Sequence, residues 1–178
     1  MELAGFEATA VPHMDTLYDA ALRLTGERAA AEDLTQETML RALRSFSTFR
    51  PGTNCKAWLL RIQYNLFCTQ YRKDRRLPLV WLDSPEEPSV EPPSYEPGPE
   101  EQALREMDRK SVRRAIALLP EEFRIAVTLV DIHGLSCAEA AEVMGVPRGT
   151  ILSRLHRARR RLERLLTPEL GRVQADDL

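Results

Sequence analysis

The sequence contains little that would suit a β-rich, membrane-spanning or secreted protein. Only 6% of its 178 residues are aromatic, which disfavours an all-β design. No run approaches the roughly 20 apolar residues that a membrane span needs, and the N-terminus lacks the basic start and apolar stretch of a signal peptide. We therefore expect a cytoplasmic protein with no membrane insertion.

The three cysteines and three histidines form no recognisable site. Cys55 and Cys68 fall in one predicted helix, where about 13 residues at about 1.5 Å each separate them by roughly 20 Å, too far for a disulfide. Free thiols in a reducing compartment are the simpler interpretation, with a redox role as the alternative. The histidines share no ligand spacing with the cysteines, and the sequence has no phosphate-binding glycine loop or nucleophile elbow. We expect no metal, no cofactor and no enzymatic activity.

Charge is sorted along the chain, although the net charge is only −2. Residues 84–101 contain six glutamates and no basic residue, whereas residues 148–164 contain seven arginines and a single acid, Glu163. The distribution of charge along the chain is more informative than the net charge. The acidic residues of 84–101 offset the basic residues of 148–164 in the net charge. A basic segment of this kind is typical of nucleic-acid binding.

The first part of the chain, residues 1–83, is predicted to be a helical domain. Apolar residues at helical spacing indicate helices over about 14–24, 30–46 and 55–72, and Gly26 fits the C-terminal cap of the first. The breaker-rich residues 49–54 predict a loop. The apolar stripes assigned to the second and third helices are Met39, Leu43 and Phe46, and Trp58, Ile62, Leu66 and Thr69.

Residues 84–101 read as a linker, because their prolines and glutamates can neither continue a helix nor form a core. At full stretch this segment would reach roughly 60 Å. Residues 102–178 then form a second predicted helical domain. We expect the whole chain to be all-α, with two small helical domains joined by a flexible, acidic, proline-rich linker.

The second domain is predicted to contain a helix-turn-helix. An apolar stripe at Leu104, Met107, Ser111, Ala115 and Leu118 precedes a helix that begins at Pro120 and ends near Gly134. Ser136 and Glu139 match a capping box that opens a short helix, and Gly145 permits a turn. The last helix places Ile151, Leu155, Ala158, Leu162 and Leu165 on one face and a stripe of arginines on another. A short helix, a glycine-bearing turn and a basic amphipathic helix are typical of this DNA-binding motif; a solvated basic face on a bundle helix is the alternative.

Motifs in both halves resemble the extracytoplasmic-function (ECF) family of RNA polymerase sigma factors. Residues 33–42, Phe49-Arg50, residues 58–62 and Asn65 resemble region 2 of that family, and residues 119–124, 134–136, 139–141 and 149–159 resemble region 4. Residues 122–127 and 153–157 look most similar to the thiol-oxidative-stress subgroup, in which redox sensing resides in the anti-sigma factor. The cysteines therefore need carry no sensor role.

The resemblance implies a transcription initiation factor that binds core RNA polymerase, promoter DNA and an anti-sigma factor. The polymerase contacts would be the β′ clamp and the β flap, and the linker would thread toward the active-site cleft. The implied clamp-binding residues are Asp33, Gln36, Glu37 and Arg41. Those implied to capture the melted −10 element are Phe49, Asn54, Arg61, Asn65, Arg72 and Lys73, with Trp58 in the core. Those implied to lie over the −35 duplex are Arg148, Thr150, Ser153, Arg154, His156 and Arg157; Leu152 stands where some relatives carry arginine.

Two other interpretations of the sequence remain open. A stand-alone helix-turn-helix regulator would bind duplex operators without polymerase, but it has no need of residues 49–76. A helical adaptor would use the basic helix to bind an acidic protein.

Overall fold

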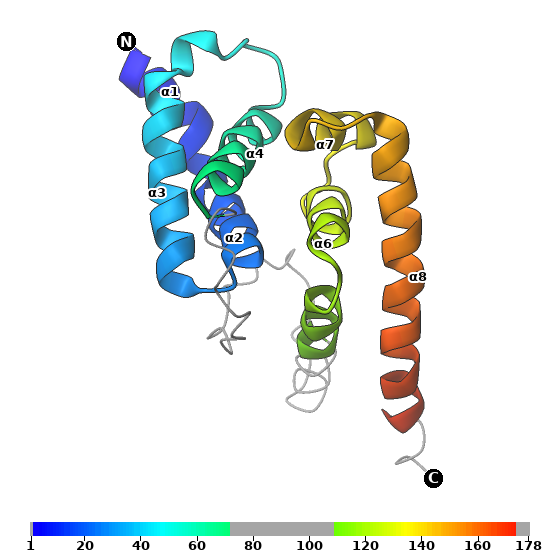
Figure 1. The fold of residues 1–178 in the computed structure, drawn as a ribbon. Coiled ribbons are helices and arrows are strands. Elements are labelled where there is room, and N and C mark those ends of the chain that lie inside the picture. The colour runs from blue at the N-terminus through cyan, green and yellow to red at the C-terminus, as the bar shows by residue number, and fades with distance from the viewer. Residues whose placement is uncertain (1, 72–108, 174–178) are drawn as a thin grey trace, which may run out of the picture.

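The computed structural model describes residues 2–71 and 109–173, and these ranges contain helices and no strand. The first range holds α1 (Glu2–Ala10), a 3₁₀ turn (Val11–His13), α2 (Met14–Thr25), α3 (Arg28–Arg44), a second 3₁₀ turn (Phe46–Thr48), α4 (Cys55–Leu66) and a π-helical turn (Phe67–Tyr71). In the second range, residues 109–117 are helical, followed by α6 (Glu121–Val127), a π-helical turn (Thr128–Ile132), α7 (Cys137–Met144) and α8 (Arg148–Val173). Figure 1 shows α1–α4 as one group of helices, with α6, α7 and α8 beside it. The predicted linker, 84–101, lies outside the described residues.

The all-α class and the predicted N-terminal helices are confirmed, with bounds that differ by a few residues. Gly26 ends α2 at φ 72°, a left-handed conformation that glycine adopts without steric cost. The predicted loop at 49–54 is present. Asn54 caps α4, its side-chain oxygen accepting a hydrogen bond from the Ala57 amide.

The apolar stripe predicted for residues 30–46 is confirmed in part. Met39 and Phe46 pack against the core, but Leu43 is 38% exposed, and Thr35 and Thr38 are buried in its place. Each threonine hydroxyl donates to the carbonyl four residues earlier, at 2.8 Å for Thr35 and 2.6 Å for Thr38. Once its hydroxyl is paired within the helix, threonine packs like a β-branched apolar residue. A pattern that counted only apolar residues therefore missed these two buried positions.

The predicted stripe on α4 is confirmed except at its end. Leu66 is buried and Trp58 and Ile62 pack against the core, but Thr69 is exposed. The buried face is wider than the stripe, because Leu59, Leu60 and Gln63 are also buried. The Gln63 amide donates to the carbonyl of Leu17 at 2.8 Å, which ties α4 to α2. This bond lets a polar side chain occupy a core position.

The helix-turn-helix of the second half is confirmed in its details. Ser136 and Glu139 form the predicted capping box, Gly145 ends α7 at φ 64°, and α8 starts directly after Pro147. Two apolar assignments were wrong: Leu118 is 67% exposed because the helix before it ends at residue 117, and Leu165 is 37% exposed. The remaining face of α8 is buried at Ile151, Leu155 and Ala158 and half-buried at Leu162.

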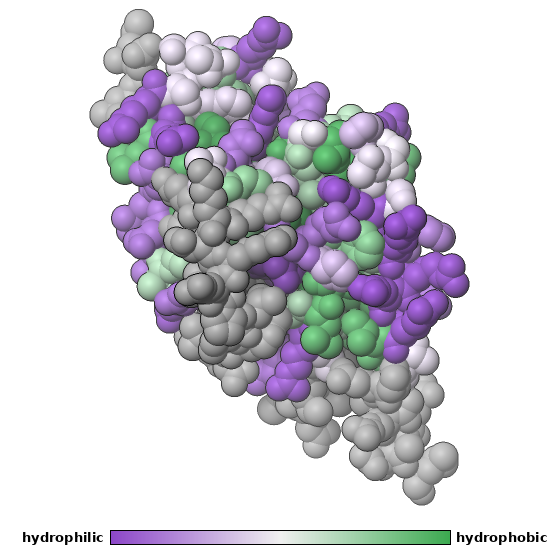
Figure 2. All heavy atoms as spheres, in the orientation of Figure 1, coloured by the Kyte–Doolittle hydropathy of each residue, from purple (hydrophilic) through white to green (hydrophobic). Residues whose placement is uncertain are grey.

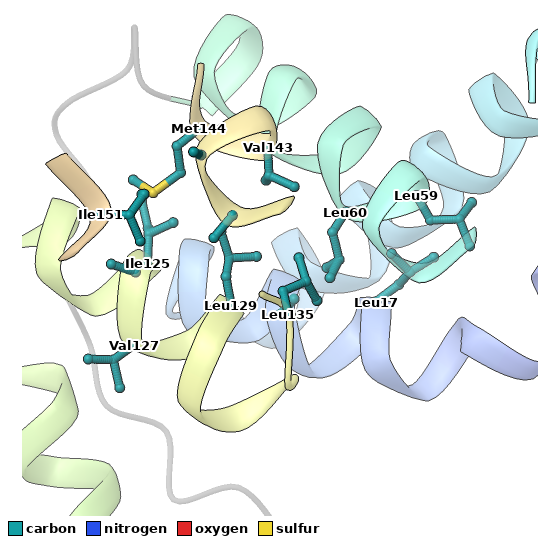
Figure 3. Packing of buried hydrophobic residues seen from close by; sticks show 14 of the residues in the cluster. Leu17, Leu59, Leu60, Ile125, Val127, Leu129, Leu135, Val143, Met144 and Ile151 are labelled. Carbon is teal, nitrogen blue, oxygen red and sulfur yellow. The ribbon is translucent and has the colours of Figure 1, made fainter. Parts of the chain in front are cut away.

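One apolar cluster extends across both halves of the protein. It includes Leu17, Leu59 and Leu60 from α2 and α4, and Leu129, Leu135, Val143 and Ile151 from the second half. In Figure 3, Leu135 points toward Leu17 and Leu60, beside Leu129. We call the contact between the two halves the seam. It joins α2 and α4 to α6, the π-helical turn after it, and α7.

The seam buries the imidazole ring of His133. The ring of His133, only 7% exposed, places Nε2 3.4 Å from Oδ2 of Asp19 in α2. Burial lowers the pKa of His133 to about 4, an effect that the Asp19 carboxylate opposes and that Arg23 and Lys56 reinforce. His133 is therefore neutral at physiological pH.

We predict that Ser136→Ala lowers the free energy of unfolding by about 1 kcal/mol, because it removes the N-cap acceptor of α7. Urea denaturation measures the difference as a lower midpoint at unchanged slope. Ser136→Thr keeps the hydroxyl and serves as the matched control. Equal midpoints for the alanine variant and the parent would show that the cap contributes nothing.

We predict that the protein loses stability as the pH falls from about 6.5 toward 4. His133 has a lower pKa when folded than its ordinary 6.5, so the unfolded chain binds a proton that the folded one does not. Its stabilising contribution is complete above pH 6.5 and declines below it. His133→Gln removes the titrating ring and should flatten the dependence over this range; an unaltered pH profile would contradict the assignment.

Candidate nucleic-acid interface

The first three turns of α8 expose a polar face beside the buried one. Residues of an α-helix advance by about 100° each, so Thr150, Ser153, Arg154 and Arg157 fall on one side. Ser153 and Arg157 are exposed, and Thr150 and Arg154 half-buried. Figure 2 shows hydrophilic side chains gathered along the edge of the molecule where α8 runs in Figure 1. Four of the six residues expected to contact the −35 element therefore share one face.

The arginines of α8 are not equally available. Arg154, with its side chain 19% exposed, pairs with Glu122 of α6 at 3.2 Å. Arg159 donates two hydrogen bonds to the carboxylate of Asp131, at 2.6 and 3.2 Å, and this bond raises its pKa further. Arg157 is exposed and makes no ion pair with any other described residue. It is the basic residue of the face that is free to meet an anion.

Arg148 and His156 stand apart from this face. Arg148 is the first residue of α8, and His156 lines a shallow hollow with Cys137, Leu152 and Arg159. The family resemblance grouped them with the other four residues, but the rotation of the helix separates them from that face.

The exposed face of α4 carries the residues expected to bind the −10 element. Asn54, Arg61 and Asn65 are spaced by seven and four residues, so they lie along one side of the helix, and all three are exposed. Arg72 and Lys73 lie outside the described residues.

Phe49 lies at the edge of an aromatic cluster that closes the end of this face. Its ring stacks on Phe46 with centroids 5.9 Å apart and lies 5.2 Å from Trp58. Trp58 packs against the core, as expected. Phe49 is half-buried, so one part of its ring holds the loop and the other part faces solvent.

The residues expected to bind polymerase lie on the outer side of α3. Asp33, Gln36 and Arg41 are exposed and Glu37 is half-buried, with Glu37 3.5 Å from Arg41. Sequence reasoning missed the neighbouring Leu40, which is 49% exposed. The signal was available, because Leu40 does not belong to the stripe assigned to the core.

Sequence reasoning also missed a contact between the candidate −10 face and α7. The Asn54 amide donates to Oε1 of Glu139 in α7 at 2.7 Å. The pKa of Glu139 is lowered first by the Ser136 backbone amide and then by the Asn54 side chain. Beside this pair, Lys56 donates to the backbone carbonyl of His133. No local pattern could indicate a bond between residues so far apart in the chain.

Other kinds of site are not found in the described ranges. They contain no group of three or more histidine, cysteine or acidic side chains that could hold a metal ion. Cys55, Cys68 and Cys137 are free thiols. Across the same residues, no helix is both long and apolar enough to span a bilayer.

Comparison with known protein families separates the chain into the same two halves. Residues 11–77 match the Sigma-70 region 2 family, and residues 109–162 match the Sigma-70, region 4 family. The domain limits 1–83, 84–101 and 102–178 stay predictions.

Curated relatives and a solved structure agree with these matches. The chain is 41% identical to the ECF RNA polymerase sigma factor SigE of Mycolicibacterium smegmatis over 84% of its own length and 57% of the relative's. It is 38% identical to the ECF RNA polymerase sigma factor EcfG of Rhodopseudomonas palustris, covering 82% of this chain and 76% of the relative. The sigma factor RpoE of Bartonella quintana, solved in complex with the anti-sigma factor NepR, aligns with a TM-score of 0.69 at 30% identity, over 92% of this chain and 97% of that one.

The chain spans just over half the length of the first of these relatives, SigE. The narrower likeness to the thiol-oxidative-stress subgroup stays a prediction. With both regions present in order and the identity extending through most of the chain, the protein belongs to the ECF family of RNA polymerase sigma factors.

Proposed function

We propose that this protein binds core RNA polymerase and directs promoter-specific initiation by recognising a duplex −35 element and a melted −10 element. The observation that carries the proposal is the presence, in one chain, of a complete helix-turn-helix and a second polar face on α4. A duplex operator binder needs only the first of these.

The −35 element would be read by α8. In a helix-turn-helix the second helix enters the major groove and the first crosses the DNA backbone. Arg157 can reach guanine edges or phosphates, and the hydroxyls of Thr150 and Ser153 can donate to either. Arg148 and His156, which stand off this face, would contact the flanking backbone.

The −10 element would be captured as single strand on α4 and the loop before it. A base taken out of the stack needs an apolar or aromatic surface and hydrogen-bonding groups. The exposed part of Phe49 supplies the surface, and Asn54 and Asn65 supply amide groups. Arg61, with Arg72 and Lys73 in the basic stretch that follows, would neutralise phosphates.

The partners follow from the surfaces and from the relatives. The outer side of α3, with Asp33, Gln36, Glu37 and Arg41, would dock on the polymerase β′ clamp, and the second half on the β flap. Because a similar sigma factor was solved with an anti-sigma factor, we infer that such a protein also restrains this one. The chemistry of transcription would belong to the polymerase, so we infer no enzymatic activity. The protein would act in the cytoplasm, where its thiols stay reduced.

Run-off transcription with core polymerase and a library of promoter fragments tests the proposal. We expect specific start sites that depend on both promoter elements. The control is core polymerase alone, which should give none. Strong binding to duplex DNA without any directed start would instead favour the stand-alone regulator.

We predict that Arg157→Ala weakens binding to a −35 duplex by about 1–3 kcal/mol if the guanidinium contacts a base. Gel-shift titration of the parent and the variant measures the difference. Arg28→Ala removes the same charge from α3, where Arg28 lies 3.5 Å from Glu32, and is the matched control. An unchanged affinity for the Arg157 variant would remove this residue from the interface.

A further inference from the structure

One arginine of the candidate −35 face is held in place, unlike its neighbour. Nη2 of Arg154 donates to Oε2 of Glu122 in α6 at 3.2 Å, and its Nη1 lies 4.0 Å from Sδ of Met144, the last residue of α7. Only 19% of the Arg154 side chain is exposed, whereas Arg157, one turn later on the same face, is exposed. The guanidinium of Arg154 is therefore fixed between the start of α6 and the end of α7 in the protein alone.

The charges of the two helix ends favour this position. The amino-terminal end of a helix carries a partial positive charge and the carboxyl-terminal end a partial negative charge. The carboxylate of Glu122 lies in the first turn of α6, and the guanidinium of Arg154 lies beside the last residue of α7. An ion pair near the surface contributes little to stability. Its main effect here is to set the orientation of the arginine.

The orientation leaves donors of Arg154 for another acceptor. A guanidinium carries more N–H groups than the contacts with Glu122 and Met144 use. Arg154 lies in the second turn of α8, and the amino-terminal residues of such a helix contact base edges. The planar fork of an arginine matches the adjacent O6 and N7 acceptors of guanine. Arg154 is therefore suited to a guanine in the major groove.

The carboxylate of Glu122 also affects which acceptor Arg154 prefers. A phosphate is an anion, and it would be repelled by a carboxylate 3.2 Å from the same guanidinium. A guanine edge carries no net charge, so this repulsion is absent. A long side chain that is already ordered also loses less rotamer freedom on binding. Both effects favour a base over the DNA backbone.

We propose that Glu122 is a positioning residue, which holds Arg154 for a guanine edge of the −35 duplex and so determines base preference without contacting DNA itself. This inference rests on the proposed function, because it requires α8 to lie in the major groove.

Substitutions at the ion pair separate orientation from charge. Glu122→Ala removes the carboxylate, and because the Glu122 side chain is 54% exposed, its loss leaves the core intact. Arg154→Lys keeps the charge and the stem but lacks the planar fork. Asp131→Ala is the matched control, since it also removes a carboxylate partner from an arginine of α8. That arginine, Arg159, lies about 140° around the helix from Arg154.

Gel-shift selection from a randomised duplex, with the full-length parent protein, gives the preferred −35 sequence. Titration of its single-base-pair variants then gives the preference at each position. In Glu122→Ala, the preference for guanine at one base pair should fall about two- to tenfold, because the side chain must now be ordered on binding. The other positions should keep their preferences, and Asp131→Ala should match the parent at every position.

Two further comparisons distinguish positioning from a merely structural role. Affinity of Glu122→Ala for an unrelated duplex should not fall, because a negative charge has been removed near the phosphates. In a chain that already carries Arg154→Lys, Glu122→Ala should leave the base preferences unchanged. Equal weakening on every duplex, or an equal loss of preference with lysine at position 154, would overturn the inference.

The same titrations separate this inference from the proposed function. A parent protein that discriminates among −35 duplexes, with Glu122→Ala discriminating equally well, would overturn the positioning role and leave the proposed function standing. A parent protein that prefers no −35 duplex would overturn both.

Discussion

Burial of apolar side chains between α2, α4 and α7 is the constraint on which the rest of the structure depends. Leu135 inserts beside Leu17 and Leu60, so helices distant in the sequence share one core. Neither half is large, and a small domain buries too little surface to be very stable alone. The shared core adds burial to both halves. It also fixes the distance between the two faces that carry the candidate DNA contacts, and so it links stability directly to function.

The sequence was sufficient for features that depend on local chemistry. The capping box at Ser136 and the turns at Gly26 and Gly145 were predicted and confirmed. Each follows from unpaired helix-end groups or from a backbone angle that only glycine adopts easily. The all-α class follows from apolar spacing in the same way.

Features that depend on tertiary partners could not be predicted. Gln63 is polar, yet it is buried because a carbonyl of α2 accepts from it, and that carbonyl is 46 residues away in the chain. The threonines of α3 were overlooked because their hydroxyls bond within the helix. The candidate site has the same limit. Residue type and spacing indicate a helical face, but they do not indicate that Arg154 pairs with Glu122 or Asn54 with Glu139.

The two ion pairs between α8 and the preceding elements have a consequence for how this helix responds to ionic strength. A basic side chain that displaces condensed cations from DNA makes affinity fall steeply with salt. Arg154 and Arg159 already have carboxylate partners in Glu122 and Asp131, so each would exchange one anion for another on contacting a phosphate. The number of arginines in α8 therefore overestimates the number of condensed cations that are released from DNA when the protein binds. Its binding would be less sensitive to salt than its charge composition suggests.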